Sequence, residues 1–131
     1  MLEDKECIFC NKKNCEIIFS SDYFFVIRDT SYPVTKHHTL VISNRHVSEY
    51  FDLTENEFND LNKILKEQRK QLLELDNSIT AFNIGVNIGE DSGQSIMHCH
   101  IHLIPRRKGD VEDPRGGVRG VIPSKQKYER K

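Results

Sequence analysis

The strongest constraint on the fold is an alternating run, IMHCHIHLIPR, at residues 96–106. His98, His100 and His102 occupy every second position of this run. Successive side chains of a β-strand turn to opposite faces, so the pattern predicts a strand with three imidazoles on one face. The other face is expected in the core and consists of Cys99, Ile101 and Leu103. A buried imidazole needs hydrogen-bond partners and packs no better than valine or leucine, so the histidine face indicates function.

Length and charge restrict the class of protein. A chain of 131 residues is expected to form a single domain, residues 1–131, with one sizeable core. Nineteen basic and twenty acidic residues give a net charge of −1, which favours neither nucleic acid nor membrane surfaces. No apolar stretch approaches the roughly 18 residues of a membrane-spanning helix, and the N-terminus is acidic and polar. We therefore expect a cytoplasmic protein.

Hydrophobic periodicity predicts an α+β fold. Thr54 and Glu57 form a capping-box pattern at the start of a long amphipathic helix that is expected to end near residues 76–77. The apolar stripe of this helix is Phe58, Leu61, Leu65, Leu72 and Leu75. Strands are expected at residues 17–19, 23–27, 38–43, 80–87 and 96–106. Together they predict a five-stranded, mainly antiparallel sheet with one long helix, a short helix, and an irregular tail over residues 110–131.

Two chemistries use closely spaced histidines on one strand. One is a catalytic metal site, in which two or three imidazoles hold zinc and leave a position for water. The other is covalent catalysis, in which one imidazole attacks phosphorus and its neighbours hold the oxygens. Gly93, Gln94 and Ser95 precede the strand and offer amide, hydroxyl and backbone donors suited to phosphate. The nearest carboxylates, Glu90 and Asp91, lie in a turn rather than on the strand, so phosphoryl or nucleotidyl chemistry is favoured.

Three ordered blocks of the sequence resemble the histidine triad (HIT) family. The run HCHIHLI matches the family's pattern of three histidines separated by apolar residues, preceded by the lead-in NIGEDSGQSIM. The stretch HHTLVISNRH is similar to the family's second block, and CIFC with the long intervening helix adds a third. The resemblance spans roughly residues 7–109 and implies a HIT-like fold, with a tail from residue 110 onward.

The resemblance also implies roles for individual residues. His100 would be the nucleophile that attacks the α-phosphate of a nucleotide and forms a nucleotidyl-histidine intermediate. His102 would hold the phosphate, and His38 would lie near the phosphate and ribose. The implied nucleotide-binding residues are Asp29, Asn87, Gln94 and Ser95.

Two departures from the family's pattern affect the nucleoside side of this site. The loop from Asp29 to His38 is one residue longer than the family's spacing. His37 stands where the family usually has glycine. If that position requires a left-handed backbone, His37 must adopt it without the freedom of glycine.

Cys7 and Cys10 have metal-ligand spacing, which alone is a modest signal. In zinc-containing relatives the pair is completed by two histidines, which correspond here to His46 and His98. Such a Cys2His2 set is closed, so the resemblance implies a structural zinc. A redox pair, metal-free cysteines, or replacement of His46 by Cys15 remain alternatives, whereas Cys99 should face away from His98.

The third triad histidine, His102, keeps the hydrolase pattern of the family. The stretch PRRKGD at residues 105–110 resembles the segment that follows the triad in dinucleoside polyphosphate hydrolases. Its cations would neutralise a polyphosphate, although a solvated charge run is the simpler interpretation. The alternatives are cleavage of a nucleoside phosphoramidate or acyl-nucleotide, and a non-catalytic nucleotide-binding module. The family also implies a homodimer, and residues 115–119 (RGGVR) are expected to reach a site in their own chain or the partner's.

Overall fold

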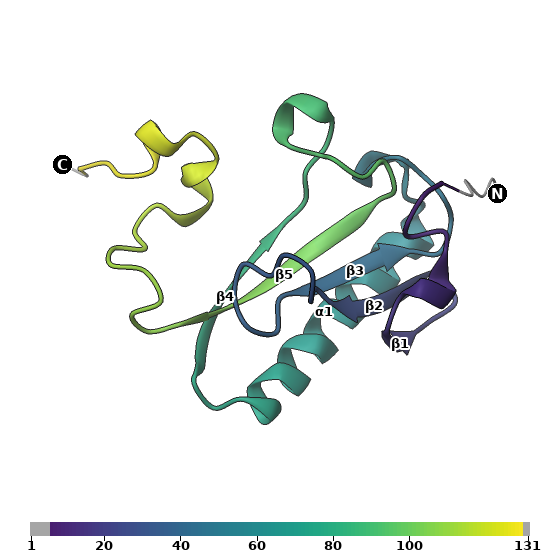
Figure 1. Ribbon diagram of the computed structural model, residues 1–131, viewed down its shortest axis with the longest axis horizontal. Coiled ribbons are helices and arrows are strands. Elements are labelled where there is room, and N and C mark those ends of the chain that lie inside the picture. The colour runs from purple at the N-terminus through teal and green to yellow at the C-terminus, as the bar shows by residue number, and fades with distance from the viewer. Residues whose placement is uncertain (1–5, 130–131) are drawn as a thin grey trace.

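The computed structural model describes residues 6–129 and contains one antiparallel sheet in the strand order β1-β2-β3-β5-β4. The strands are β1 (Ile17–Ser20), β2 (Phe24–Arg28), β3 (Thr39–Ser43), β4 (Ile79–Gly85) and β5 (His100–Arg107). A single α-helix, α1 (Glu55–Leu75), lies along one face of the sheet (Figure 1). Within residues 6–129 no helix has the length and apolar character needed to cross a membrane. The predicted α+β class and five-stranded sheet are confirmed.

Short 3-10 turns take the place of the predicted short helix. They are η1 (Lys12–Asn14), η2 (Tyr50–Asp52), η3 (Glu90–Ser92), η4 (Gly117–Val121) and η5 (Pro123–Lys125). None exceeds five residues, as expected for a helix type with poorer hydrogen-bond geometry.

The start of α1 follows the predicted capping box. The Thr54 side chain accepts a hydrogen bond from the Glu57 backbone N–H (3.2 Å), and the Glu57 carboxylate accepts one from the Thr54 N–H (2.8 Å). Glu57 is buried and also pairs with Arg45 at 2.7 Å. The helix is therefore fixed at its first turn to the segment that follows β3.

The core lies between α1 and one face of the sheet. Along β5, Ile101, Leu103 and Pro105 are buried while the residues between them are half-buried, which is the alternation of a strand with one core face. The main cluster consists of Phe24, Val26, Val41, Leu53, Leu61, Ile64, Cys99 and Ile101. Leu75, assigned to the apolar stripe of the helix, is 61% exposed because α1 ends there.

The histidine strand is shorter than predicted. It begins at His100 instead of residue 96, and His98 lies in a bend just before it. The Cys99 N–H donates to the carbonyl of Val47, which lies outside the neighbouring strands, while the Cys99 carbonyl accepts from the N–H of Ser43 at the end of β3 (3.1 Å). The regular ladder starts only after this residue. Strand alternation therefore places His100 and His102 on one face, whereas His98 is positioned by its own contacts.

The tail beyond β5 forms a separate C-terminal arm, residues 111–129, that stands to one side of the sheet beyond β4 (Figure 1). Its two turns, η4 and η5, pack on each other around Gln126. A Cβ on Gly116, which has φ +91°, would collide with the Gln126 carbonyl, and one on Gly120 would come within 2.6 Å of the Gln126 side chain. The arm is thus irregular but closely folded on itself.

Candidate active site and metal cluster

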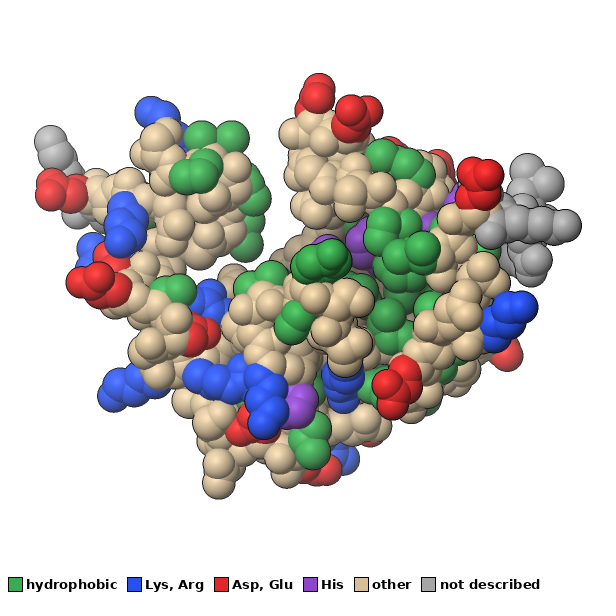
Figure 2. Space-filling model, in the orientation of Figure 1, with side chains coloured by type: hydrophobic (Ala, Val, Ile, Leu, Met, Phe, Trp, Pro, Cys, Tyr) green, Lys and Arg blue, Asp and Glu red, His purple; other side chains and the backbone are tan. Residues whose placement is uncertain are grey.

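The register of the sheet brings the site histidines together on the face opposite α1. In the register between β3 and β5, His102 pairs with Leu40 and His100 pairs with Ile42. His38 immediately precedes β3, so it reaches the same face beside His102. In the space-filling view, histidine atoms lie at the bottom of a recess lined by hydrophobic side chains (Figure 2). The sheet register therefore assembles a histidine cluster from segments about 60 residues apart.

His100 is held in one tautomer by the backbone. Its Nδ1 lies 2.7 Å from the carbonyl oxygen of His98, so Nδ1 carries the proton and donates it. The lone pair is then on Nε2. Burial lowers the pKa of His100, which keeps the ring neutral. A neutral imidazole with a free nitrogen is the form that acts as a nucleophile.

A chain of hydrogen bonds defines the opposite tautomer in His102. The Val34 N–H donates to His38 Nδ1 (3.1 Å), so the proton of His38 is on Nε2. That proton is donated to His102 Nδ1 at 2.9 Å, which leaves the proton of His102 on its Nε2. Burial, and then the charges of His100 and His38, lower the pKa of His102 to about 4. The ring of His102, whose centroid lies 5.3 Å from that of His100, therefore carries an N–H donor at Nε2.

Asp29 lies beside His38 at the start of the loop that leads to β3. One carboxylate oxygen accepts hydrogen bonds from the backbones of Ser31 (3.1 Å) and Tyr32 (3.0 Å), and the other lies 3.9 Å from His38 Nδ1. The Asp29 N–H donates to the His38 carbonyl at 2.7 Å, which closes the loop. The structure brings Asp29 to the histidine cluster, and its contact with a ribose stays a prediction.

His37 adopts the backbone conformation that the glycine of the family pattern suggested. Its φ is 73°, in the left-handed region that residues with a Cβ seldom occupy. Its Nε2 lies 3.7 Å from the carboxylate of Asp76, away from the His38 and His102 pair. His37 therefore meets the left-handed requirement and takes a contact outside the cluster.

The polar lead-in to β5 divides into a buried and an exposed part. The Gln94 side chain is buried: its Nε2 donates to the carbonyls of Ser48 (2.6 Å) and Ile96 (3.1 Å), and its Oε1 accepts from Gly89 N–H (2.9 Å). Because both of its amide protons are donated to backbone carbonyls, Gln94 stabilises the conformation of the loop before β5. Ser95 is exposed and Asn87 is half-buried. A direct phosphate contact is thus easier for Ser95 and Asn87 than for Gln94.

Cys7, Cys10, His46 and His98 form a compact group whose ligand atoms all lie within 4.8 Å of one another. The Cys10 Sγ lies 3.1 Å from His46 Nδ1, and His98 Nδ1 lies 3.1 Å from the same nitrogen. His98 Nε2 donates to the Ser43 carbonyl at 2.7 Å, so His98 Nδ1 presents its lone pair to the group. Two sulfurs and two ring nitrogens converging in this way fit a tetrahedral metal ion.

The other two cysteines lie outside this group. Cys99 is buried in the core against α1, and burial raises the pKa of its thiol to about 12. Cys15 follows η1, with its thiol near the carbonyls of Ile8 and Asn11. The fourth member of the group is therefore His46 and not Cys15, and within residues 6–129 no cysteine forms a disulfide.

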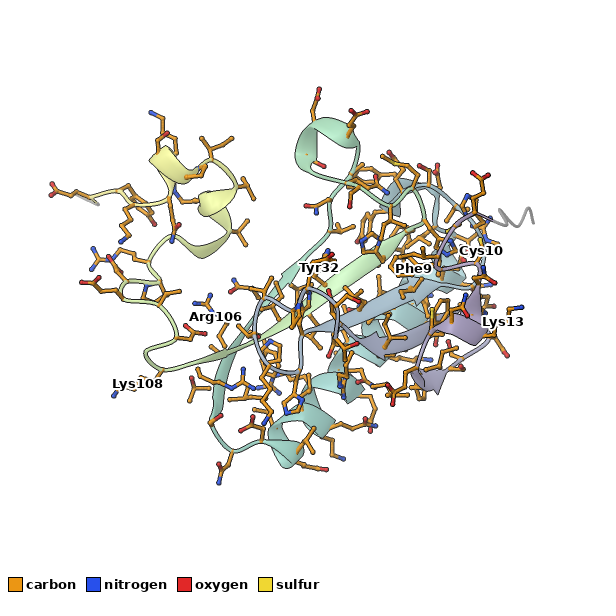
Figure 3. The ribbon with its side chains drawn as sticks, in the orientation of Figure 1. Phe9, Cys10, Lys13, Tyr32, Arg106 and Lys108 are labelled. Carbon is orange, nitrogen blue, oxygen red and sulfur yellow. The ribbon has the colours of Figure 1, made fainter. Side chains whose placement is uncertain are left out.

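Two of the three cations after the triad are held by the protein itself. Arg106 donates to both carboxylate oxygens of Asp110 at 2.8 Å and to Asn83 at 2.7 Å. Arg107 donates to Asp76 at 3.0 Å. Lys108 is exposed at the turn after β5 (Figure 3). Charge on Arg106 and Arg107 is thus largely compensated, which weakens their predicted role in binding polyphosphate.

The sequence reasoning missed Phe9. It lies between the two cysteines of the metal group, is buried, and packs beside the rings of His98 and His100. Figure 3 shows it next to Cys10, above the end of the sheet near β2 and β3. The only signal in the sequence is an aromatic residue between two potential ligands, and spacing rules for ligands ignore such positions.

Comparison with known proteins identifies the family. The model of the HIT domain matches residues 11–109 of this chain. A bis(5'-nucleosyl)-tetraphosphatase [asymmetrical] from Schizosaccharomyces pombe is 40% identical over 81 residues, which are 62% of this chain and 44% of that protein. A nitrilase and fragile histidine triad fusion protein from Caenorhabditis elegans is 39% identical over 97 residues, 74% of this chain and 22% of that protein. This chain thus spans less than half of either relative.

A solved structure of a zinc-bound relative has the same fold. A zinc-bound histidine triad family protein from Mycobacterium smegmatis superposes with a TM-score of 0.73 at 27% identity, covering 82% of this chain and 80% of that one.

Proposed function

This chain belongs to the histidine triad (HIT) family, and from that premise we propose that it hydrolyses dinucleoside polyphosphates, such as diadenosine tetraphosphate, at an α-phosphate. The relative from S. pombe is named for this class of reaction. The proposal assigns His100 as the nucleophile, with His102 and His38 beside it. Asp29, Asn87 and Ser95 are proposed to contact the nucleotide, and Gln94 is proposed to hold the loop next to it.

The observation that carries the proposal is the pair of opposite tautomers. His100 presents an unprotonated Nε2, because its Nδ1 donates to the His98 carbonyl at 2.7 Å. His102 presents an Nε2–H, because its Nδ1 accepts from His38 at 2.9 Å. A phosphate between them meets a lone pair directed at phosphorus and a donor directed at a non-bridging oxygen. That combination suits covalent catalysis at phosphorus.

The reaction balances in two steps. In the first, the lone pair of His100 Nε2 forms an N–P bond while the bond from the α-phosphorus to the bridging oxygen breaks. The nucleoside polyphosphate leaves with that oxygen and its electron pair. In the second step, water attacks the same phosphorus and gives up one proton to solvent, the N–P bond breaks with its electron pair returning to Nε2, and a nucleoside monophosphate and neutral His100 are released. No oxidant, reductant or further cofactor enters either step.

The test uses two substrates and one variant. Wild-type protein is incubated with diadenosine tetraphosphate and with an adenosine phosphoramidate, and release of AMP is followed. We expect AMP from the tetraphosphate, with a rate at least about 1,000-fold lower for His100→Ala because the nucleophile is missing. Preference for the phosphoramidate would change the substrate class but keep the mechanism. Binding of AMP without turnover of either compound would contradict the proposed hydrolase activity and indicate a non-catalytic nucleotide-binding module.

We further propose that the group Cys7, Cys10, His46 and His98 holds a structural zinc. The support is the donor set, the lone pair that His98 directs into the group, and the zinc-bound relative from M. smegmatis. All four ligand positions are filled by protein, so the ion would tie the N-terminal turn to β3 and β5 without taking part in the reaction. The four cysteines form no disulfide within the described residues, which fits a reducing compartment, and we place the protein in the cytoplasm, which cell fractionation tests.

We propose a homodimer that forms along β4. This strand is an edge of the sheet and carries no charged residue, which is unusual for an edge that faces water. Next to it is a cleft of about 470 Å³ lined largely by apolar side chains of α1 and β4, including Phe58, Leu61, Leu65 and Ile84. Light scattering at micromolar concentration is expected to give twice the 15.3 kDa mass of the chain, and a monomer would contradict the proposal.

A further inference from the structure

One aromatic side chain connects the metal group to the histidine proposed as the nucleophile. The ring of Phe9 lies edge-on to His100 with centroids 5.1 Å apart and planes at 66°. The same ring is edge-on to His98, at 5.9 Å and 85°. Phe9 is only 4% exposed. These separations are those of favourable aromatic pairs, so Phe9 contacts a metal-group histidine and the nucleophile together.

One hydrogen bond and two aromatic neighbours define the orientation of the His100 ring. The hydrogen bond from Nδ1 to the His98 carbonyl sets the tautomer, but a single bond at one ring nitrogen lets the ring tilt about it. The ring has two aromatic neighbours, Phe9 and His102, the latter at 5.3 Å and 62°. Removing the Phe9 ring therefore takes away one of the two aromatic contacts that restrict where Nε2 is directed.

The position of Phe9 depends in turn on the two cysteines that flank it. The N-terminal knuckle, residues 7–14, contains no strand and bonds to itself through few backbone contacts, such as Asn11 N–H to the Cys7 carbonyl at 3.3 Å. The side chains of Cys7 and Cys10 reach into the metal group, and Phe9 between them packs on Phe25 and Ile42 of the sheet. The knuckle therefore holds Phe9 against His100 from outside the strand.

We propose that Phe9 is a positioning residue that keeps His100 aimed at phosphorus and makes this aim depend on the N-terminal knuckle. The inference rests on the proposed role of His100 as the nucleophile. A buried phenylalanine also contributes packing energy, which any residue of the same cluster would do. A positioning role differs because it acts on the rate of the chemical step: small misplacements of a reacting group reduce turnover by up to about 100-fold.

The test compares Phe9→Leu with the matched variant Phe25→Leu. Phe25 is fully buried in the same cluster, but its ring neighbour is the Lys12 ammonium, at 4.8 Å, and not a histidine. Hydrolysis of diadenosine tetraphosphate is measured at equal zinc content, together with Tm. We expect both variants to lose similar stability, Phe9→Leu to lose about tenfold or more in kcat with KM within about twofold, and Phe25→Leu to keep its kcat within about twofold. Equal losses of kcat, or an unchanged kcat in Phe9→Leu, would overturn the proposal.

A second readout does not depend on turnover. In zinc-loaded protein labelled at histidine, NMR follows the carbon-bound ring protons of His100, whose line widths report motion of the ring. We expect narrow signals in wild type and Phe25→Leu, and broadened signals in Phe9→Leu, because the ring then samples several tilts about its hydrogen bond. Signals as narrow in Phe9→Leu as in wild type overturn the proposal. If the signals broaden while wild type hydrolyses no nucleotide, positioning by Phe9 stands and the proposed hydrolase function fails.

Discussion

The N-terminal knuckle and the C-terminal arm are both irregular, yet they are held in opposite ways. The knuckle is attached through side chains that meet residues far away in the sequence: Cys7 lies near His98, and Cys10 near His46. The arm is attached mainly to itself, through Gln126 packing on Gly116 and Gly120. Both segments lack strands and α-helices, but the knuckle is joined to residues around β3 and β5, whereas the arm approaches the sheet where Gly117 lies near Asn83 of β4.

The contrast shows that irregular backbone has two sources of order. Contacts between residues far apart in the sequence transmit a local structural change to the sheet, whereas contacts within one segment confine the change to that segment. The arm carries exposed apolar residues such as Val118, Val121 and Ile122. Figure 2 shows hydrophobic side chains on the side of the arm that faces the rest of the molecule. It therefore keeps its shape without burying its own apolar surface. We expect damage to the knuckle to spread to β3 and β5, and damage to the arm to remain local.

The largest effect is expected from Cys7→Ser combined with Cys10→Ser. The double variant removes both sulfur ligands, so it should lose about one zinc per chain and lower Tm by about 10 °C or more, because ligand binding contributes directly to folding. Metal analysis and thermal unfolding measure the two quantities. Cys15→Ser is the control, since this thiol lies outside the metal group, and it should retain the metal. Full zinc retention by the double variant would refute the site.

A smaller effect on the whole protein is expected from Gly116→Ala. The new Cβ would collide with the Gln126 carbonyl at φ +91°, so the arm should open. Trypsin should then cleave faster at Arg115 and Arg119, while Tm changes by no more than about 2 °C. Gly109→Ala is the control: its φ is also positive, at +81°, but nothing lies within 4 Å of the added Cβ. A fall in Tm as large as that of the double cysteine variant would show that the arm unfolds cooperatively with the rest of the domain and would contradict this prediction.

Local sequence patterns predicted most of the fold because the interactions behind them are local. Thr54 and Glu57 indicate the start of α1, because each side chain accepts a hydrogen bond from the backbone N–H of the other residue, three positions away. The alternation of Ile101 and Leu103 with histidines predicts a strand with one buried face, and the structure has it. The bend at His98 was missed because it depends on Val47, a residue from another part of the chain.

The candidate site was predictable only in part. Convergence of His46 with Cys7 and Cys10 followed from the family resemblance, since nothing in their spacing places them together. The arrangement of tautomers depends on Val34 donating to His38, a contact that arises only once the loop is folded. The compensation of Arg106 by Asp110 is a pairing at i, i+4 across a turn, and composition alone does not distinguish it from a solvated charge run.

The acceptor that sets the tautomer of His100 is a main-chain carbonyl, that of His98. A peptide oxygen is present whatever side chain occupies position 98, so point mutation there can abolish a metal ligand without deleting this acceptor. The tautomer of His100 and the orientation of its ring therefore respond differently to mutation. The tautomer depends on a main-chain acceptor and persists through side-chain substitutions, whereas the orientation depends on neighbouring side chains and changes with them. An evolving lineage can thus tune the speed of such a catalyst gradually while its reactive form is preserved.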